Sequence, residues 1–330
     1  KEGNPLWEQY STRVVAHTLK SYSSHTFDYP YPTAISVEGS NGMEYPMICF
    51  NYGRPDADGT YSDAIKYGMI SVIIHEVGHN YFPMIVNSDE RQWTWMDEGL
   101  NTFMQFMAEQ EWDRNYPSRR GPAHKIVPYM KSEKHLLEPI MTNSENIIQF
   151  GPNAYAKPAT ALNILRETVM GRDLFDFAFQ EYSRRWMFKH PTPDDLFRTL
   201  EDASAVDLDW FWRGWFYGTE PVDISIENVA WYKLDNRTPA QKKADAKADF
   251  DREEASVSKE ANVKGVPATV VEADPATRDF YNSYNPFTVT PEDEATYKTF
   301  LASLSEKEKS LLNSNMNFYE MTFKNVGGLV

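Results

Sequence analysis

Two histidines and a glutamate lie close together in an apolar stretch of the chain, at His75, Glu76 and His79. On a helix, residues four positions apart lie one turn apart on the same face, so both imidazoles can reach one point. Zinc binds histidine nitrogen and carboxylate oxygen, and a catalytic zinc site keeps one position open for water. The spacing therefore predicts two metal ligands, with Glu76 turned slightly away from the metal as the general base.

A third metal ligand is predicted at Glu98, which follows His79 after eighteen intervening residues. Glu98 falls near the start of a helix that is expected to begin close to Asp97 and to bury Phe103. A carboxylate beside buried aromatic side chains is costly unless a cation or a donor compensates it. Eighteen residues suffice for a helix end, a loop and a return, so Glu98 completes a set of ligands for one Zn²⁺ per chain.

The two histidines are expected on a helix that runs from about Tyr61 to Phe82 and is ended by Pro83. Its central residues, 69–74, are apolar nearly all round, which predicts that this helix is buried. Two hydrogen-bonded core histidines are the alternative to a metal site. A glutamate between them at this spacing favours the metal site.

A tyrosine and an edge strand are the other candidate parts of the site. Tyr155 lies at the start of a helix expected over residues 153–170, where its phenol could project into a cleft or simply pack. Residues 43–50 are expected to form one strand, in which Pro46 suits a sheet edge because an edge position needs no ladder donor. A free edge can pair with an extended peptide, and Glu44 could hold the positive amino end of that peptide. A solvated carboxylate at a strand end is the alternative role for Glu44.

The remaining elements are expected to be mainly helical, after a short strand at residues 34–37. In the helix expected at 173–189, the residues placed on the buried side are Leu174, Phe177, Ala178, Tyr182 and Trp186. Further helices are predicted at 5–20, 193–203 and 291–313, and a strand is predicted at 223–231. These elements indicate an α+β protein in which a small, edge-exposed β-sheet is followed by a mainly α-helical lobe.

Composition and charge exclude several classes of function. The net charge of −15 and the pI of about 5.0, without a long basic stripe, argue against nucleic-acid binding. No run of eighteen apolar residues occurs, so no membrane span is expected. The single cysteine, Cys49, leaves no internal disulfide and no cysteine-based zinc site. The compartment is left open, with a periplasmic or secreted location as the working assumption and a cytoplasmic one as the alternative.

Changes in composition predict three segments. Residues 1–235 carry the site and the apolar helices. Residues 236–315 open with a run of mixed charges and are expected to be an insertion or linker with helices. Residues 316–330 are expected to start a C-terminal β-domain. Both ends resemble cuts into a longer protein, so an N-terminal and a C-terminal domain of the same parent chain are expected partners.

The chain resembles the gluzincin aminopeptidases of the aminopeptidase N family over about residues 25–220. The zinc motif is matched by His75-Glu76-x-x-His79 with Glu98. Two further stretches are similar to family motifs: Asn41-Gly42-Met43-Glu44-Tyr45 to the exopeptidase motif Gly-x-Met-Glu-Asn, and Tyr155-x-Lys157 to the catalytic Tyr-x-Lys-Gly. This sequence departs from those motifs at Asn41, Tyr45 and Pro158.

The resemblance implies a thermolysin-like zincin domain that releases N-terminal residues from peptides. It implies that Tyr155 stabilises the oxyanion and that Gly42, Met43 and Glu44 bind the substrate, Glu44 at the free amino terminus. A thermolysin-like endopeptidase is the alternative enzyme, since it explains the zinc site equally well. A zinc-binding, peptide-recognising relative with little turnover is the alternative outside catalysis.

Overall fold

The structure is a computed structural model that describes residues 2–256, 269–314 and 316–329. The chain divides into two compact units, one of Lys1–Ser225 with Asn325–Val330 and the other of Ile226–Lys324. The division at residues 235 and 315 that the sequence suggests stays a prediction.

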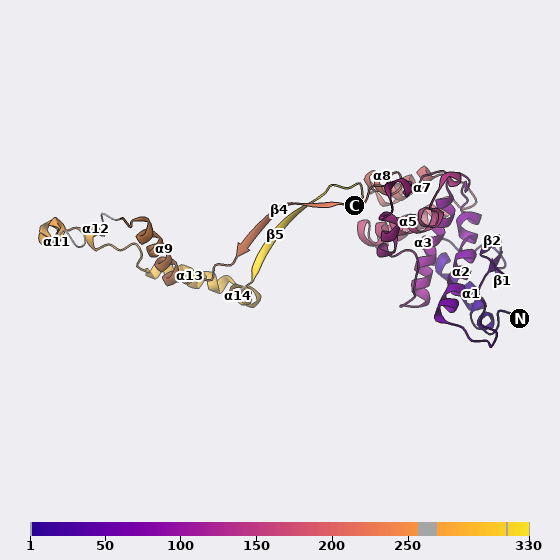
Figure 1. Cartoon of the computed structure of the whole chain (residues 1–330), viewed down its shortest axis with the longest axis horizontal. Coiled ribbons are helices and arrows are strands. Elements are labelled where there is room, and N and C mark those ends of the chain that lie inside the picture. The colour runs from indigo at the N-terminus through magenta and orange to yellow at the C-terminus, as the bar shows by residue number, and fades with distance from the viewer. Residues whose placement is uncertain (1, 257–268, 315, 330) are drawn as a thin grey trace. The chain divides into compact units, whose positions relative to one another are not determined.

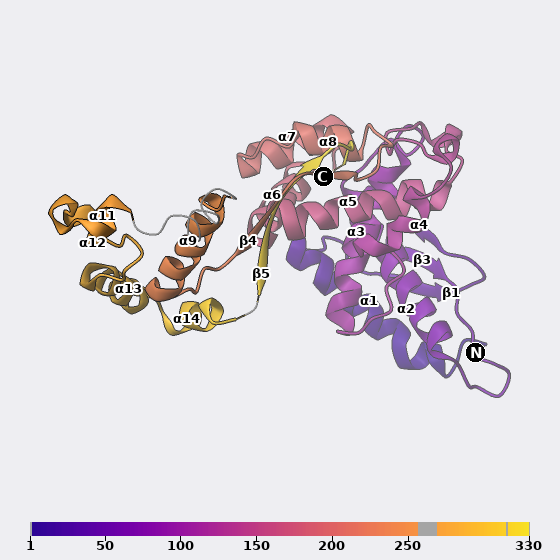
Figure 2. The same ribbon diagram turned by 60° about the vertical axis from the view of Figure 1, so that its left-hand side comes forward.

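The first unit begins with a long helix, a small sheet and the helix that carries the two histidines. In chain order these are α1 (Leu6–His25), β1 (Ile35–Glu38), β2 (Met43–Tyr45), β3 (Ile48–Asn51) and α2 (Asp63–Gly78). The strand order is β1-β3-β2, with β1 parallel and β2 antiparallel to β3, so β2 is an edge strand. Helix α1 packs on α2, and both contact the sheet (Figure 1 and Figure 2).

Residues 43–50 form two strands, so the prediction of a single strand was wrong. A turn at Pro46 and Met47 joins β2 to β3, and Met47 has the left-handed φ of 67°. Proline fixes its own φ and has no N–H donor, which suits a turn corner better than the edge position that was predicted. The side-chain oxygen of Asn80 accepts a hydrogen bond from the Met47 N–H at 2.8 Å, which ties this turn to the end of α2.

Helices make up the rest of the first unit, which confirms the predicted α+β class with a small sheet and a mainly helical lobe. The longer ones are α3 (Thr94–Trp112), α5 (Lys157–Ile164), α6 (Arg172–Arg185), α7 (Pro193–Ser204) and α8 (Asp209–Trp215). The shorter ones are η1 (Asn80–Ile85), η2 (Ala123–Ile126), α4 (Val127–Met130), η3 (Lys134–Leu136), η4 (Ser144–Asn146), η5 (Gly151–Ala156) and η6 (Leu165–Val169). Of these, η1, η5 and η6 are π-helical.

Helix α2 is buried, as its apolar sequence predicts. The Ser62 side chain accepts a hydrogen bond from the Ile65 N–H and caps the helix, and Met69, Ile70, Ile73 and Ile74 are completely buried. The helix ends at Gly78, four residues before the predicted end, and π-helical η1 follows it. The predicted end at Phe82 was therefore wrong.

The centre of the unit is helix α3, which packs against α1, α2 and α5. The completely buried side-chain amide of Asn101 joins α3 to α2 and α1. It donates a hydrogen bond to the His75 carbonyl of α2 at 2.8 Å and accepts one from the Tyr22 hydroxyl of α1 at 2.8 Å. On the α5 side, a Cβ at Gly99 would lie 2.5 Å from Cγ of Pro158. The proline that departs from the family motif therefore packs directly on the residue after Glu98, because glycine at 99 leaves room for it.

Helix α6 buries Ala178 and Tyr182, as predicted, but Phe175 and Phe179 are buried instead of Phe177. Phe175, Ala178, Phe179 and Tyr182 are buried, whereas Phe177 is 53% exposed. The spacing of the buried residues is the i, i+3, i+4, i+7 pattern of one helical face. The prediction was therefore correct for Ala178 and Tyr182 and wrong for Phe177, whereas Leu174 and Trp186 are only partly buried.

The second unit is a two-stranded sheet with helices between its strands. Its elements are β4 (Ile224–Lys233), α9 (Pro239–Glu253), α11 (Val270–Ala273), η7 (Pro275–Thr277), α12 (Phe280–Ser283), α13 (Pro291–Ser303), α14 (Glu306–Leu312) and β5 (Asn317–Asn325). Strands β4 and β5 pair with each other (Figure 1). The single helix predicted at 291–313 is two helices, because Ser305 caps a new one through a capping box with Glu308.

The part of the chain that the structure describes contains no helix both long and apolar enough to cross a bilayer.

Candidate metal centre

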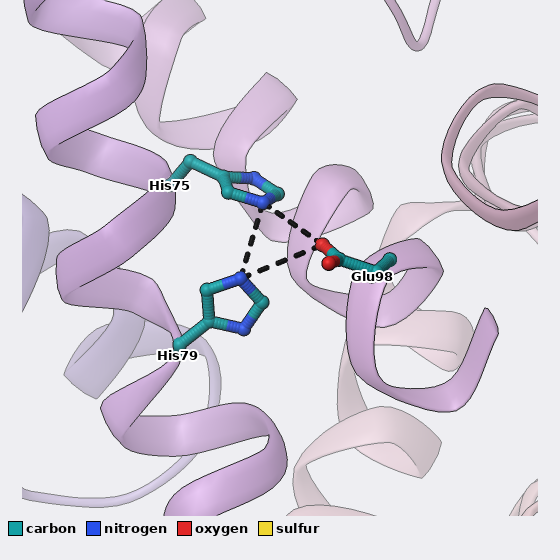
Figure 3. A group of neighbouring side chains, drawn as sticks. All are labelled: His75, His79 and Glu98. Carbon is teal, nitrogen blue, oxygen red and sulfur yellow. Dashed lines mark hydrogen bonds and ion pairs between the residues drawn. The ribbon is translucent and has the colours of Figure 1, made fainter. Parts of the chain in front are cut away.

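The side chains of His75, His79 and Glu98 meet at one point between α2 and α3 (Figure 3). The two Nε2 atoms lie 3.1 Å apart, and Oε2 of Glu98 lies 3.0 Å from Nε2 of His75 and 3.5 Å from Nε2 of His79. Ligands about 2.0–2.1 Å from a tetrahedral zinc ion lie about 3.3 Å from one another. The three ligand atoms therefore already have the separations that a bound zinc requires.

The second nitrogen of His75 is engaged by a glutamine of α3. Nδ1 of His75 lies 2.9 Å from Oε1 of Gln105. The Gln105 amide nitrogen donates to the Ser71 carbonyl at 3.3 Å and to Oε1 of Glu109 at 2.8 Å, and both of these only accept. These contacts fix which end of the amide faces the imidazole, so Nδ1 carries the proton and Nε2 presents its lone pair.

The second nitrogen of His79 is held in the same way. Its Nδ1 donates to the Phe82 carbonyl at 2.9 Å and lies 2.9 Å from Oδ1 of the buried Asp97. Phe82 has extended backbone angles, φ −130° and ψ 108°, because the residue before Pro83 is disfavoured in the helical region. This departure from the helix directs the Phe82 carbonyl at His79.

Two lone pairs therefore face each other at 3.1 Å, beside a carboxylate oxygen. This arrangement is repulsive unless a shared proton or a bound cation lies among the three atoms. Burial opposes the charged form of His79, but the carboxylates of Asp97 and Glu98 raise its pKa well above the ordinary value, so His79 is the imidazole that holds such a proton in the absence of a metal. Burial lowers the pKa of His75, which favours the neutral imidazole that a metal requires. The donor set of two nitrogens and one oxygen, with both imidazoles oriented from behind, fits zinc.

Glu76 lies on α2 beside this point, and the chain folds closely over it. Burial raises the pKa of Glu76 to about 8, and the nearby Glu44 carboxylate adds to the shift, whereas His79 opposes it. A Cβ added at Gly42 would overlap Oε1 of Glu76 and lie 3.2 Å from its Cδ. Only glycine leaves space at 42 for the Glu76 carboxylate in this position.

The three residues of the predicted substrate-binding motif lie at the open side of the sheet. Gly42 precedes β2, Met43 pairs with Phe50 in β3, and Glu44 pairs with Cys49. Oxygen atoms of Glu44 and Glu76 and a nitrogen of His79 lie within 4.8 Å of one another. The structure thus brings Glu44 to the rim of the metal centre.

Tyr155 lies beside the metal centre on π-helical η5. Its ring stacks on His75 with centroids 5.7 Å apart and planes 25° from parallel. Burial, and then the negative charge of Glu98, raise the pKa of the Tyr155 phenol, which keeps its proton available for donation.

A cavity of about 420 Å³ opens beside the metal centre. His75, Glu76 and Tyr155 form its inner end, and the guanidinium of Arg120 lies with its Cζ 4.3 Å from the centroid of the Tyr155 ring. Small-molecule sites commonly have this volume, with a few convergent polar groups.

Gln105, Asp97 and Arg120 also surround the site, although no sequence motif marked them. Gln105 follows Glu98 by seven residues, two helical turns, so its place on the same face of α3 was a usable signal. Asp97 is adjacent to Glu98 in the sequence and carried no such signal. Arg120 lies in a loop whose path depends on the tertiary fold.

A helix with His-Glu-x-x-His, joined by a glutamate from a neighbouring helix in an α+β fold, defines a catalytic domain of the zinc metallopeptidase class. The family model described as "Peptidase family M1 domain" matches residues 10–215. The chain belongs to this peptidase family.

Several known proteins are similar to the chain. It is 24% identical to an aminopeptidase A from Gloydius brevicauda over 290 residues, which are 82% of this chain and 28% of the relative. It is 26% identical to a glutamyl aminopeptidase from Sus scrofa over 231 residues, which are 66% of this chain and 24% of the relative. An M1 zinc metallopeptidase from Deinococcus radiodurans aligns with a TM-score of 0.48 and 19% identity, covering 62% of this chain and 44% of that structure. The chain thus spans about a quarter of the length of the curated relatives.

Proposed function

We propose that the protein uses zinc to hydrolyse the first peptide bond of peptides and so releases N-terminal residues. The observation that carries this proposal is the position of Glu44. Its carboxylate lies at the rim of the metal centre, next to Glu76 and at the start of an edge strand. A carboxylate there can pair with a free amino terminus one residue away from the scissile bond.

Zinc bound by His75, His79 and Glu98 would supply Lewis-acid polarisation of the scissile carbonyl and an acidified water. Glu76 is the group placed to accept a proton from that water and to return it to the leaving amine. The raised pKa of Glu76 supports this role. A bound cation favours the ionised carboxylate, which accepts the proton, and burial favours the protonated carboxyl, which returns it.

The Tyr155 hydroxyl is placed to donate a hydrogen bond to the oxygen that becomes negative during attack. Its pKa is raised, so the phenol carries its proton at neutral pH. One such donor contributes about 3 kcal/mol of transition-state stabilisation in comparable sites.

The edge strand is placed to bind the peptide backbone. Among the described strands, β2 pairs with β3 on one side only, so its outer edge can pair with an extended segment. Backbone pairing at Gly42 and Met43 would bring the first residue of the peptide to Glu44.

The test is zinc content together with cleavage of matched peptides that carry either a free or an acetylated amino terminus. The zinc-loaded chain is expected to prefer the free amine by at least about tenfold in kcat/KM, since charged hydrogen bonds are worth about 1.5–3 kcal/mol. Glu44→Gln should remove that preference, and Glu38→Gln, on β1 of the same sheet, serves as the control.

Three results would contradict the proposal. Equal cleavage of free and acetylated peptides would indicate a thermolysin-like endopeptidase. Full turnover by Glu76→Gln would refute the base assignment, since that variant should retain zinc and lose activity. Stoichiometric zinc with no cleavage of any peptide would leave a zinc-binding peptide-recognition protein.

A further inference from the structure

Arg120 is a half-buried cation that lacks a hydrogen-bond or ion-pair partner among the described residues. No hydrogen bond or ion pair joins its guanidinium to any residue within 2–256, 269–314 and 316–329, the described ranges. Arg166 in the same unit shows the usual arrangement, because its guanidinium pairs with both oxygens of Asp176 at 2.5 and 2.7 Å. An arginine that is partly removed from water normally has such a carboxylate partner.

The fold holds the Arg120 guanidinium at the wall of the cavity beside the metal centre. Its Cζ lies 4.3 Å from the centroid of the Tyr155 ring, a stacked cation–π geometry that restricts the side chain. Burial lowers the pKa of Arg120, which indicates incomplete hydration. Its hydrogen-bond donors are thus oriented without being used by the described part of the protein.

The acidic groups of the same cavity do not substitute for a partner. Oε1 of Glu109 accepts hydrogen bonds from Ser71 and Gln105 at 2.8 Å each. Glu76 lies at the metal centre, where the reaction requires it. Glu98 acts on the charge of Arg120 only at longer range. A carboxylate on a molecule that enters the cavity would supply the direct ion pair that the described residues do not form.

The position of the cavity relative to Glu44 indicates which part of a peptide would enter it. Glu44 is not among the residues that line the cavity, whereas His75, Glu76 and Tyr155 are. If the amino terminus is at Glu44 and the scissile carbonyl is at Tyr155, the residue after the scissile bond extends into the cavity. One extended residue spans about 3.5 Å, so a carboxylate on that residue can reach a guanidinium stacked on the Tyr155 ring.

We propose that Arg120 binds a carboxylate on the residue that follows the scissile bond. This inference rests on the proposed function and adds a substrate class to it. The carboxylate has two possible sources, which are the C-terminal group of a dipeptide and the side chain of an aspartate or glutamate in a longer peptide. Planar guanidinium and carboxylate groups form two parallel hydrogen bonds, a geometry that lysine does not reproduce.

The test compares kcat/KM for two matched pairs of substrates with the zinc-loaded full chain. The pair Ala-Ala and Ala-Ala-NH2 isolates the terminal carboxylate, and the pair Ala-Glu-NH2 and Ala-Gln-NH2 isolates the acidic side chain. At least one pair is expected to favour the carboxylate by about ten- to hundredfold, the usual range for a charge-assisted hydrogen bond. The pair that shows the preference identifies the source.

Arg120→Gln should abolish this preference, so that kcat/KM becomes equal within about twofold for the two members of each pair, while zinc content stays that of the unmodified chain. Arg120→Lys should retain only part of the preference. Arg114→Gln is the matched control. Arg114 is exposed, lies in the same loop after α3 as Arg120, and does not line the cavity. A loss of activity that is equal for acidic and neutral substrates would mean that Arg120 only supports Tyr155, and it would overturn the inference.

A binding measurement separates failure of this inference from failure of the proposed function. Calorimetric titration of the zinc-loaded Glu76→Gln variant with the same four compounds requires no turnover. A carboxylate preference that disappears in the Glu76→Gln, Arg120→Gln double variant supports the Arg120 assignment even if no peptide is cleaved. Equal affinities within both pairs, alongside cleavage of Ala-Gln-NH2, would refute the assignment and leave the peptidase activity intact.

Discussion

Gly42→Ala is expected to move the general base without disturbing the metal. In the structure, a Cβ at residue 42 would lie 3.1 Å from Cγ2 of Val72 and 3.2 Å from Cδ of Glu76, and it would overlap Oε1 of Glu76. Neither imidazole and no atom of Glu98 is among its nearest neighbours. The added methyl group therefore acts on Glu76 and not on the three ligands.

The size of the effect follows from the contact. An ordinary contact to a Cβ begins at about 3.4 Å, and Oε1 of Glu76 is about 1 Å inside that limit, so the carboxylate must shift by about 1 Å. A displacement of this size at a catalytic group costs about 10²-fold in rate, or about 2.7 kcal/mol of transition-state stabilisation. The overlapping atom is the end of a flexible side chain, so the free energy of unfolding should change by less than about 1 kcal/mol.

The assay is kcat/KM on an unblocked peptide, with zinc content and thermal unfolding measured on the same preparation. Gly39→Ala is the control from the same loop, since a Cβ there meets its nearest atoms, in Asn41 and Phe50, at an ordinary 3.7 Å. Activity of Gly42→Ala within twofold of the unmodified chain would refute the argument that this close approach positions Glu76. Loss of zinc in the variant would show that the loop supports the metal centre as a whole.

Three further predictions follow from the polar groups around the site. Gln105→Leu should weaken zinc affinity by about 10–100-fold, because Nδ1 of His75 loses the acceptor that orients the imidazole. Competition with a chelator measures the zinc affinity, and an unchanged affinity would contradict the orienting role of Gln105. Tyr155→Phe should lower kcat by about 10²-fold at constant zinc content in single-turnover and zinc assays, and unaltered kcat would exclude the phenol from oxyanion stabilisation. Burial lowers the pKa of Lys157 from 10.5 to about 8. Between pH 8 and 10.5 the lysine is therefore mostly protonated in the unfolded state and mostly neutral in the folded state, so its contribution to the free energy of unfolding rises with pH over that range. Between pH 8.0 and 9.5, the free energy of unfolding of the unmodified chain should rise by about 1.5 kcal/mol relative to that of Lys157→Met. Urea titrations in the presence of a chelator measure this difference. If the difference between the two proteins does not change with pH, Lys157 is not desolvated.

Much of the helical framework could be predicted because its signals are local. The apolar run at residues 69–74 predicted a buried helix, and its residues are buried in α2. The errors arose where several local signals competed. Residues 43–50 are apolar enough for one strand, but Pro46 and the left-handed Met47 form a turn within them. In α6 Ala178 and Tyr182 were placed correctly, but Phe175, Phe177 and Phe179 are similarly apolar, and only the packing partners decide which of them are buried.

The sequence alone determined which residues could bind a metal. Two histidines four positions apart on a helix must share a face. The eighteen residues between His79 and Glu98 are enough for the chain to turn and for the next helix to bring Glu98 back to that face. These statements depend on helical geometry and chain length, which are properties of the sequence pattern. They required no knowledge of how the helices pack.

Only the tertiary structure decided how those residues are held and what surrounds them. Gln105 faces His75 because α3 packs on α2 in one register, and Gly42 covers Glu76 because the β1–β2 loop lies against the same helix. The unpaired guanidinium of Arg120 at the cavity wall is likewise a property of the folded loop. Contacts between residues distant in sequence depend on packing free energy, which is distributed over the whole core and is not encoded in any single spacing.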